Sequence, residues 1–107
     1  KTIGVDYDNR LVAIARKNLR GMDARVSHGN ILSEDRFWSH KGHNNPHVVR
    51  NATVVTIYLG NGLNEALKPL LEKELEKGTR VVSNFFPVRG WDPIETDRKN
   101  TVFMYVL

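Results

Sequence analysis

An aspartate at the end of a strand-like run is the first residue whose position suggests chemistry. The segment 1–8 has the sequence KTIGVDYD, in which Thr2 to Val5 favour a strand and Asp6 stands where that strand should end. Directly before a helix, such a carboxylate can accept hydrogen bonds from both ribose hydroxyls of a nucleotide. The alternative is a solvated turn residue, so the remaining residues must decide between the two.

Three histidines offer a second chemistry. His40, His43 and His47 are spaced as H-x2-H-x3-H, which can in principle present imidazoles to zinc. They lie in the polar segment 33–51, which is rich in Asn and Gly and contains no cysteine. We therefore interpret 33–51 as a solvated loop, pinned at one end by Phe37 and Trp38, and predict no metal site.

Composition limits the class of protein. The chain has 107 residues with 16 Lys and Arg against 12 Asp and Glu, and the charges are spread without a polybasic run. A nucleic-acid surface is permitted by this charge but not required. No cysteine is present, which favours a reducing compartment such as the cytoplasm. No apolar run approaches the roughly 20 residues that a membrane span needs, so we expect no membrane association.

The pattern of apolar residues predicts alternating strands and helices. A helix is expected over 8–20, with Asp8 as its N-cap, Leu11, Val12 and other apolar residues on one face, and Gly21 beyond its end. Because Pro69 lacks an N–H group, we expect a short helical turn over 63–67 and a second helix that begins at Pro69. Strands are predicted at 24–28, 52–59, 79–85 and 101–107, with a loop at 87–100.

This order predicts an α/β fold with a largely parallel sheet, because crossover helices join parallel strands. We treat residues 1–107 as a single partial domain that contains the polar loop 33–51. The chain starts at Lys1 already inside a strand-like run, so we expect it to be a fragment or a trimmed product of a longer chain.

Three stretches together resemble a known family. The pattern GVDYDNRLVAIARKNL, then HGNIL, then ATVVTIYLGNGLNEALKPLLEKELEKGTRVVSNFFPVRGW is similar to the Rossmann-like (class I) S-adenosylmethionine-dependent methyltransferases. The last stretch resembles the archaeal and mitochondrial seven-strand protein lysine methyltransferases. This resemblance implies a Rossmann-like sheet with helices on both faces, and it adds the mitochondrion as a second expected location.

The resemblance implies a binding site for S-adenosyl-L-methionine. Asp6 matches the acid that holds the ribose hydroxyls, and Tyr7 follows it. Asn30 matches the polar residue near the adenine amino group, and Ile31 offers a backbone N–H and an apolar surface to the ring. Tyr58, at the end of a later strand, is the remaining residue of the implied cofactor site.

The same resemblance implies where the methyl acceptor lies. Tyr58 and Asn61 match the position at which these enzymes place the substrate amine, so they are the predicted catalytic residues; Tyr58 can instead be a packing residue at the sheet end. Four residues near the end of the next strand are predicted to wall a channel for the target lysine: Asn84, Phe85, Phe86 and Trp91.

One family feature has no counterpart in this sequence. The glycine-rich loop of the first strand is absent before Asp6, so the implied sheet lacks its first strand. That strand lies between the two halves of the sheet, and its loss would leave backbone groups unpaired. We therefore expect an upstream segment or a second chain to complete the sheet, and little activity from these residues alone.

The sequence is compatible with three functions. The leading prediction is S-adenosylmethionine-dependent methyl transfer to a protein lysine. A methyltransferase that acts on a small molecule or RNA is the second, although the NPPY-type motif of many base N-methyltransferases is absent at 58–61. The third is a truncated, non-catalytic α/β interaction domain.

Overall fold

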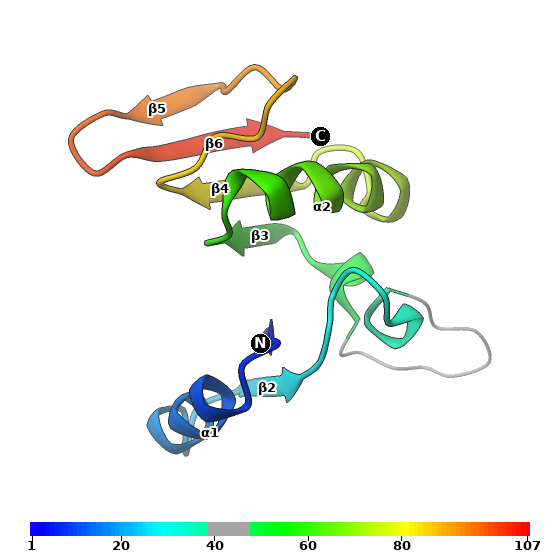
Figure 1. Cartoon of the computed structure of the whole chain (residues 1–107), viewed down its shortest axis with the longest axis vertical. Helices are drawn as coiled ribbons and strands as arrows, with labels where there is room; N and C mark the ends of the chain where they lie inside the picture. The colour runs from blue at the N-terminus through cyan, green and yellow to red at the C-terminus, as the bar shows by residue number, and fades with distance from the viewer. Residues whose placement is uncertain (39–47) are drawn as a thin grey trace. The chain divides into compact units, whose positions relative to one another are not determined.

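A computed structural model describes residues 1–38 and 48–107, which form two compact units, Lys1–Val49 and Arg50–Leu107. Each unit has its own sheet (Figure 1). The predicted histidine spacing at 40, 43 and 47 lies outside the described residues. In the described part of the chain, no helix is long and apolar enough to cross a membrane.

The first unit is a strand–helix–strand motif with a parallel pair. Strand β1 (Thr2–Asp6) leads into helix α1 (Asn9–Asn18), and strand β2 (Ala24–His28) returns beside β1. The register sets Thr2 opposite Ala24 and Asp6 opposite His28, so both strands end at the same edge. A short 3-10 helix, η1 (Asp35–Phe37), follows, and a second, η2 (Val49–Asn51), leads into the other unit. The predicted parallel pairing is confirmed here.

Helix α1 begins as the sequence predicts. The Asp8 carboxylate accepts a hydrogen bond from the Arg10 N–H at 2.9 Å, which is a standard N-cap contact. Val12 is buried, but Leu11 remains 51% exposed, so its predicted place on the buried face is wrong. A two-stranded sheet is narrow, and the stripe that begins at Val12 is enough to cover it.

The second unit is a four-stranded mixed sheet with one long helix. Its elements are β3 (Val54–Ile57), α2 (Asn61–Glu74), β4 (Arg80–Asn84), β5 (Glu95–Asp97) and β6 (Val102–Val106). The strand order is β3-β4-β6-β5, with β3 and β4 parallel and the other two pairings antiparallel. Strand β5 lies inside the predicted loop 87–100; its residues Glu-Thr-Asp are all exposed and carry no apolar signal.

Helix α2 is continuous through Pro69, so the prediction of a break before this residue is wrong. Pro69 and Glu65, the residue whose carbonyl would have bonded to the missing N–H, are both exposed. Water can therefore satisfy that carbonyl. Leu67 and Leu71 are buried on the opposite side, and packing of this face outweighs the local cost of proline, about 3 kcal/mol.

The core of the second unit lies between α2 and the sheet (Figure 1). Leu71 of α2 and Leu75, the residue that caps its C-terminus, contribute to the core from one side, and Val81 and Tyr105 contribute from β4 and β6. The Tyr105 hydroxyl accepts a hydrogen bond from the Val88 N–H at 2.9 Å, which ties the segment after β4 to the sheet.

Candidate functional site

The carboxyl ends of β1 and β2 bring together four of the five predicted cofactor residues, Asp6, Tyr7, Asn30 and Ile31, whereas Tyr58 belongs to the second unit. Asp6 lies opposite His28, and the Gly29 N–H donates to the Asp6 carbonyl at 3.0 Å. A His28 ring nitrogen lies 2.9 Å from the Tyr7 carbonyl, so the end of β2 is also joined to the residue that follows β1. Gly29 thus bonds directly to Asp6, and Asn30 and Ile31 are the next two residues along the chain.

The Asp6 carboxylate has one oxygen committed and one available. Its Oδ1 accepts a hydrogen bond from the Asp8 N–H at 2.8 Å, which fixes the side chain at the start of the helix. Within residues 1–38 and 48–107, Oδ2 has no hydrogen-bond partner. A half-buried carboxylate oriented in this way can accept a bond from a ligand hydroxyl.

The turn after β2 uses the Asn30 side chain as a cap. Its Oδ1 accepts from the Leu32 N–H at 3.0 Å, and its backbone carbonyl accepts from the N–H groups of Ser33 and Glu34. The Asn30 Oδ1, which we predicted to face an adenine amine, therefore already accepts one hydrogen bond. Its second lone pair can still accept a bond from that amine. Among the described residues the Ile31 N–H has no acceptor, while the Ile31 carbonyl accepts from the Trp38 indole at 2.8 Å.

Glu34 is a residue that the sequence interpretation missed. It accepts a hydrogen bond from the Asn30 N–H and pairs with Arg36 at 2.9 Å, and Arg36 also donates to the His28 carbonyl at 2.9 Å. The Asn30 N–H first, and the Arg36 guanidinium second, hold the pKa of the Glu34 carboxyl below its ordinary value of 4.5. The sequence feature that could have identified Glu34 is its position four residues after Asn30, from which its carboxylate can reach the Asn30 N–H.

Gly29 is required by close packing beneath this turn. A Cβ at this position would lie 2.6 Å from the Phe37 ring and 2.8 Å from a Glu34 carboxylate oxygen. Phe37 and Trp38 are both buried, which confirms the prediction that they pin this end of the polar segment. The Arg36 guanidinium lies 4.4 Å from the centre of the Phe37 ring.

The donor and acceptor set at this edge fits the nucleoside end of S-adenosylmethionine. Asp6 offers a carboxylate oxygen that has no partner among residues 1–38 and 48–107, which suits a ribose hydroxyl. Ile31 offers an N–H that is likewise unbonded within those ranges, which suits a ring nitrogen of adenine, together with an apolar side chain. The exposed Tyr7 ring adds a flat apolar surface, and its centre lies 6.2 Å from that of His28.

In the second unit, the predicted catalytic residues follow β3. Tyr58 comes directly after the strand and is 66% exposed. Asn61 is the first residue of α2, and its side-chain oxygen is buried without a hydrogen-bond partner among the described residues. A buried acceptor that lacks a donor is costly, and it is the expected state of a group that meets a ligand N–H.

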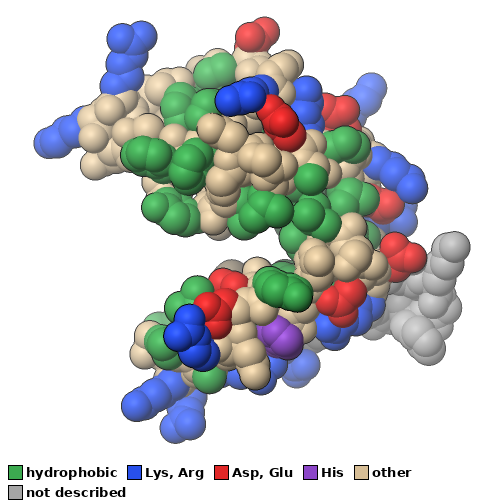
Figure 2. Space-filling model, viewed as in Figure 1, with side chains coloured by type: hydrophobic (Ala, Val, Ile, Leu, Met, Phe, Trp, Pro, Cys, Tyr) green, Lys and Arg blue, Asp and Glu red, His purple; other side chains and the backbone are tan. Residues whose placement is uncertain are grey.

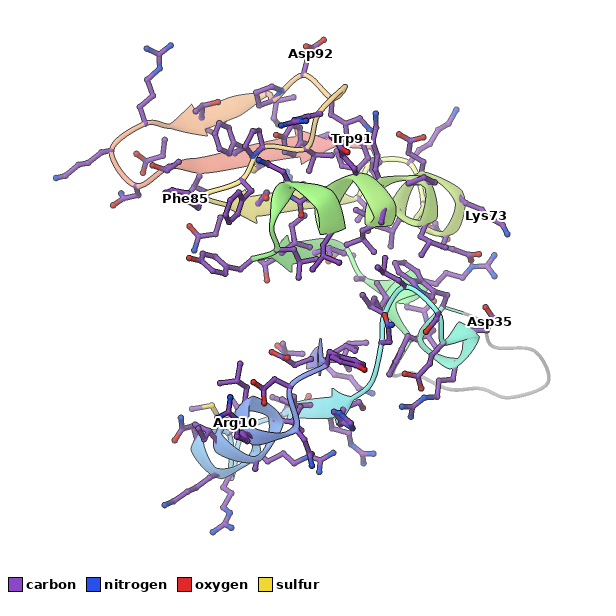
Figure 3. The ribbon with its side chains drawn as sticks, in the orientation of Figure 1. Arg10, Asp35, Lys73, Phe85, Trp91 and Asp92 are labelled. Atoms are coloured by element: carbon purple, nitrogen blue, oxygen red, sulfur yellow. The ribbon has the colours of Figure 1, made fainter. Side chains whose placement is uncertain are left out.

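Two phenylalanines after β4 lie beside Tyr58 and form an aromatic corner with it (Tyr58, Phe85 and Phe86). The Phe86 ring is edge-to-face with Tyr58 at a centroid distance of 6.4 Å and with Phe85 at 4.9 Å. Figure 3 shows Phe85 at the end of β4, beside the first turn of α2. Phe85 has φ of 69°, a left-handed conformation that costs a residue with a side chain about 1–2 kcal/mol.

Asn64 holds this corner and is a second residue that the sequence interpretation missed. It is 1% exposed, and its Nδ2 donates to the Phe86 carbonyl at 3.2 Å and to the Pro87 carbonyl at 3.5 Å. The Ser83 hydroxyl donates to the same Phe86 carbonyl. An asparagine on the helical face of Leu67 and Leu71 is the sequence signal that marks it.

The other two predicted channel residues differ in their contacts, because Trp91 contacts α2 and Tyr105 whereas the Asn84 backbone is bonded to Phe86. Trp91 donates to Glu72 at 2.8 Å and packs edge-to-face on Tyr105, with 5.5 Å between ring centres. It thereby attaches the segment after β4 to helix α2 (Figure 3). Asn84 is exposed at the end of β4, and its carbonyl accepts from the Phe86 N–H at 2.9 Å.

Comparisons with known proteins agree with this geometry. The model of the ANTKMT methyltransferase domain matches residues 1–95. A protein-lysine N-methyltransferase from Saccharolobus islandicus (strain REY15A) is 37% identical over 117 residues, covering 100% of this chain and 65% of the relative. A crystal structure of an RNA methyltransferase from Salinibacter ruber, in complex with S-adenosyl-L-homocysteine, matches with a TM-score of 0.78 and 32% identity, covering 97% of this chain and 63% of that one.

The chain thus spans a little under two thirds of the length of these two proteins. The family match covers all the predicted site residues from Asp6 to Trp91. The resemblance to methyltransferases that the sequence indicated is confirmed, and this chain belongs to the ANTKMT methyltransferase domain family.

Proposed function

We propose that this chain takes part in S-adenosylmethionine-dependent methyl transfer to the side-chain amine of a protein lysine. The observation that carries the proposal is the convergence of Asp6 with the Asn30–Ile31 turn at the end of a parallel strand pair. The protein-lysine relative, which is 37% identical to the whole of this chain, supports lysine as the acceptor.

In this proposal the first unit holds the nucleoside end of the cofactor. The free oxygen of Asp6 accepts from the ribose, and the Ile31 N–H donates to the adenine ring. Glu34 and Arg36 contribute indirectly, because they fix the turn that presents Ile31. When bound, S-adenosylmethionine supplies an electrophilic methyl group on a positively charged sulfur.

The second unit orients the acceptor amine. The nitrogen must lose a proton before its lone pair can form the new bond, and it must approach in line. The Asn61 side-chain oxygen, which is buried and has no hydrogen-bond partner in the described part of the chain, can accept an N–H of that amine. The exposed Tyr58 ring, three residues earlier, provides an apolar surface against which the aliphatic part of the lysine side chain can pack.

RNA is the second candidate acceptor, because the Salinibacter ruber neighbour is described as an RNA methyltransferase. The surroundings of the predicted acceptor residues favour a protein instead. The stretches 58–64 (YLGNGLN) and 83–87 (SNFFP) contain no Lys or Arg that could neutralise a phosphate. Arg89, which follows the second stretch, is paired with Glu65 at 3.1 Å.

Methyl-labelled S-adenosylmethionine, incubated with the chain and a cell extract, tests the proposed function. We expect the label to enter material that protease degrades and nuclease does not, and to be recovered as methyllysine after hydrolysis. Asn61→Ala should reduce incorporation while cofactor binding by calorimetry is retained. Label that nuclease removes would contradict the lysine acceptor. A folded chain with no cofactor binding would instead support the non-catalytic interaction domain.

A further inference from the structure

A groove on the first unit lies between the end of α1 and strand β2, and the charged residues that line it in the described part of the chain are all arginines. Arg16 comes from the helix, Arg20 from the turn after it and Arg25 from β2. Met22 and Val26 add apolar surface to the same groove. We call these five residues the basic groove.

The charge around the basic groove is strongly unbalanced. The stretch 16–28 (RKNLRGMDARVSH) contains four Lys or Arg and one acid, Asp23. Within residues 1–38 and 48–107, none of these four cations forms an ion pair with a carboxylate. In Figure 2, Lys and Arg side chains line the lower side of the first unit, where Figure 1 draws α1 and β2. Positive charge that is gathered in this way attracts an anionic partner.

The dipole of helix α1 explains only part of this charge. Cations in the last turn of a helix complement its negative end, and Arg16 and Lys17 occupy that turn. Arg20 lies beyond Leu19, the residue that caps the helix, and Arg25 belongs to a strand. The presence of these two arginines in the groove therefore needs another reason.

Strand β2 has a free edge beside the groove, because among the described residues it pairs only with β1. The Asp23 carbonyl and the Gly29 N–H both bond to β1 or to the residues at its ends. Backbone groups of successive residues alternate in direction along a strand. The N–H and C=O groups of Val26 and His28 therefore point away from β1, toward the free edge.

Arginines already occupy the outward carbonyls of this edge. The Arg16 Nε donates to the Val26 carbonyl at 3.0 Å, and Arg36 donates to the His28 carbonyl at 2.9 Å. What the edge still offers is mainly donors, which are the outward N–H groups of these two residues and the remaining guanidinium N–H groups. A surface of donors with positive charge fits a ligand that accepts hydrogen bonds and is negatively charged.

A polypeptide suits the basic groove better than a nucleic acid. Met22 is 64% exposed and Val26 lies beside it in the lining, so the groove offers apolar contacts as well as cations. Single-stranded nucleic acid gains much of its affinity by stacking bases on aromatic rings, and none of the described lining residues is aromatic. A protein segment of Asp or Glu interspersed with apolar residues matches both parts of the lining.

We propose that the basic groove binds an acidic segment of a partner protein, with carboxylates of that segment on the three arginines and an apolar side chain on Met22. Arg16 is held in place by its bond to the Val26 carbonyl, and its terminal N–H groups remain for the ligand. The proposal goes beyond the proposed function, because the basic groove contains none of the predicted cofactor or acceptor residues.

NMR titration of the intact chain with a short, N-acetylated peptide of glutamate interspersed with leucine tests this binding. We expect the largest amide shifts at 16–26, and an affinity that falls as salt is added because exposed charges are screened. Arg20→Gln combined with Arg25→Gln should weaken binding by about 2- to 30-fold, since each exposed ion pair contributes little. Arg10→Gln is the matched control: it removes an exposed cation near the start of the same helix and should leave binding unchanged.

Two control peptides separate charge from apolar contact. A peptide with glutamine in place of glutamate should not bind, and one with serine in place of leucine should bind more weakly. Met22→Ser should remove the preference for leucine over serine while the salt dependence remains. The double arginine variant should bind S-adenosylhomocysteine as tightly as the unsubstituted chain, so a failure of the groove is distinguishable from a failure of the proposed function.

Three results would overturn the proposal. One is equal peptide binding by the double arginine variant and the unsubstituted chain. Another is binding of RNA that depends on Arg20 and Arg25 without any binding of the acidic peptide, which would assign the groove to phosphates. The third is no peptide binding combined with aggregation of the double arginine variant, which would show that the arginines only protect the free edge of β2.

Discussion

At Asp6 the two carboxylate oxygens have different tasks, which is why the acid can be both a structural and a binding group. One oxygen accepts the Asp8 N–H and fixes the side chain, and the other is free within the described residues. This division is predictable from the sequence, because a strand-ending acid two residues before a helix cap can reach the N–H of that cap. The sequence marks Glu34 and Asn64 only by their spacing, and their bonding partners are set by contacts that the fold creates.

Asp6→Asn should weaken S-adenosylmethionine binding by about 10- to 100-fold, since a hydrogen bond to a charged group contributes about 1.5–3 kcal/mol. The amide can still accept the Asp8 N–H, so the fold should be retained. Asp23→Asn is the matched control, because Asp23 is an exposed acid of the same unit. Calorimetric titration of both variants checks the prediction, and equal affinities would remove Asp6 from the cofactor site.

Glu34 should make the Asn30–Ile31 turn sensitive to acid. Because the folded-state pKa lies below the ordinary value of 4.5, its stabilising contribution is present above pH 4.5. That contribution is lost as the pH falls through the folded-state value. NMR titration of the Glu34 carboxyl should give a pKa below 4.5, and Glu34→Gln should lose this part of the pH dependence. A pKa at or above 4.5 would contradict the network.

At the scale of elements, the sequence predicts the strands and α1 well, because their apolar periodicity is strong. The sequence-based prediction is wrong at β5 and at Pro69, and the reason differs between the two. Strand β5 is too short and too polar to carry a pattern, and it exists because β6 offers a partner edge. Pro69 breaks a local rule, and the buried face of α2 compensates for it.

Two glycine substitutions should have opposite effects on stability. Gly29→Ala should lower the free energy of unfolding by about 1–3 kcal/mol, because its Cβ would overlap the buried Phe37 ring. Gly62→Ala, on the exposed side of α2 with nothing within 4 Å, should raise it by about 0.5–1 kcal/mol. Urea unfolding of both variants measures the difference, and a tolerated Gly29→Ala would contradict the packing beneath the Asn30 turn.

At the scale of the whole chain, the predicted site residues divide between the two units. Asp6, Tyr7, Asn30 and Ile31 belong to the first unit, and Tyr58 and Asn61 belong to the second. Both groups were predicted from the family resemblance, whereas the division into two sheets follows from strand pairing. In the proposed function, cofactor recognition therefore belongs to one unit and acceptor recognition to the other.

Mapping of backbone amide shifts by NMR, as the intact chain is titrated with S-adenosylhomocysteine, shows whether the cofactor binds at the carboxyl ends of β1 and β2. We predict the largest shifts at 6–8 and 29–32, with the Ile31 N–H moving furthest because it gains an acceptor. Asp6→Asn should shift the same amides only at higher ligand concentration. Shifts confined to other segments, or none at all in a chain whose spectrum shows it to be folded, would contradict the assignment of this site.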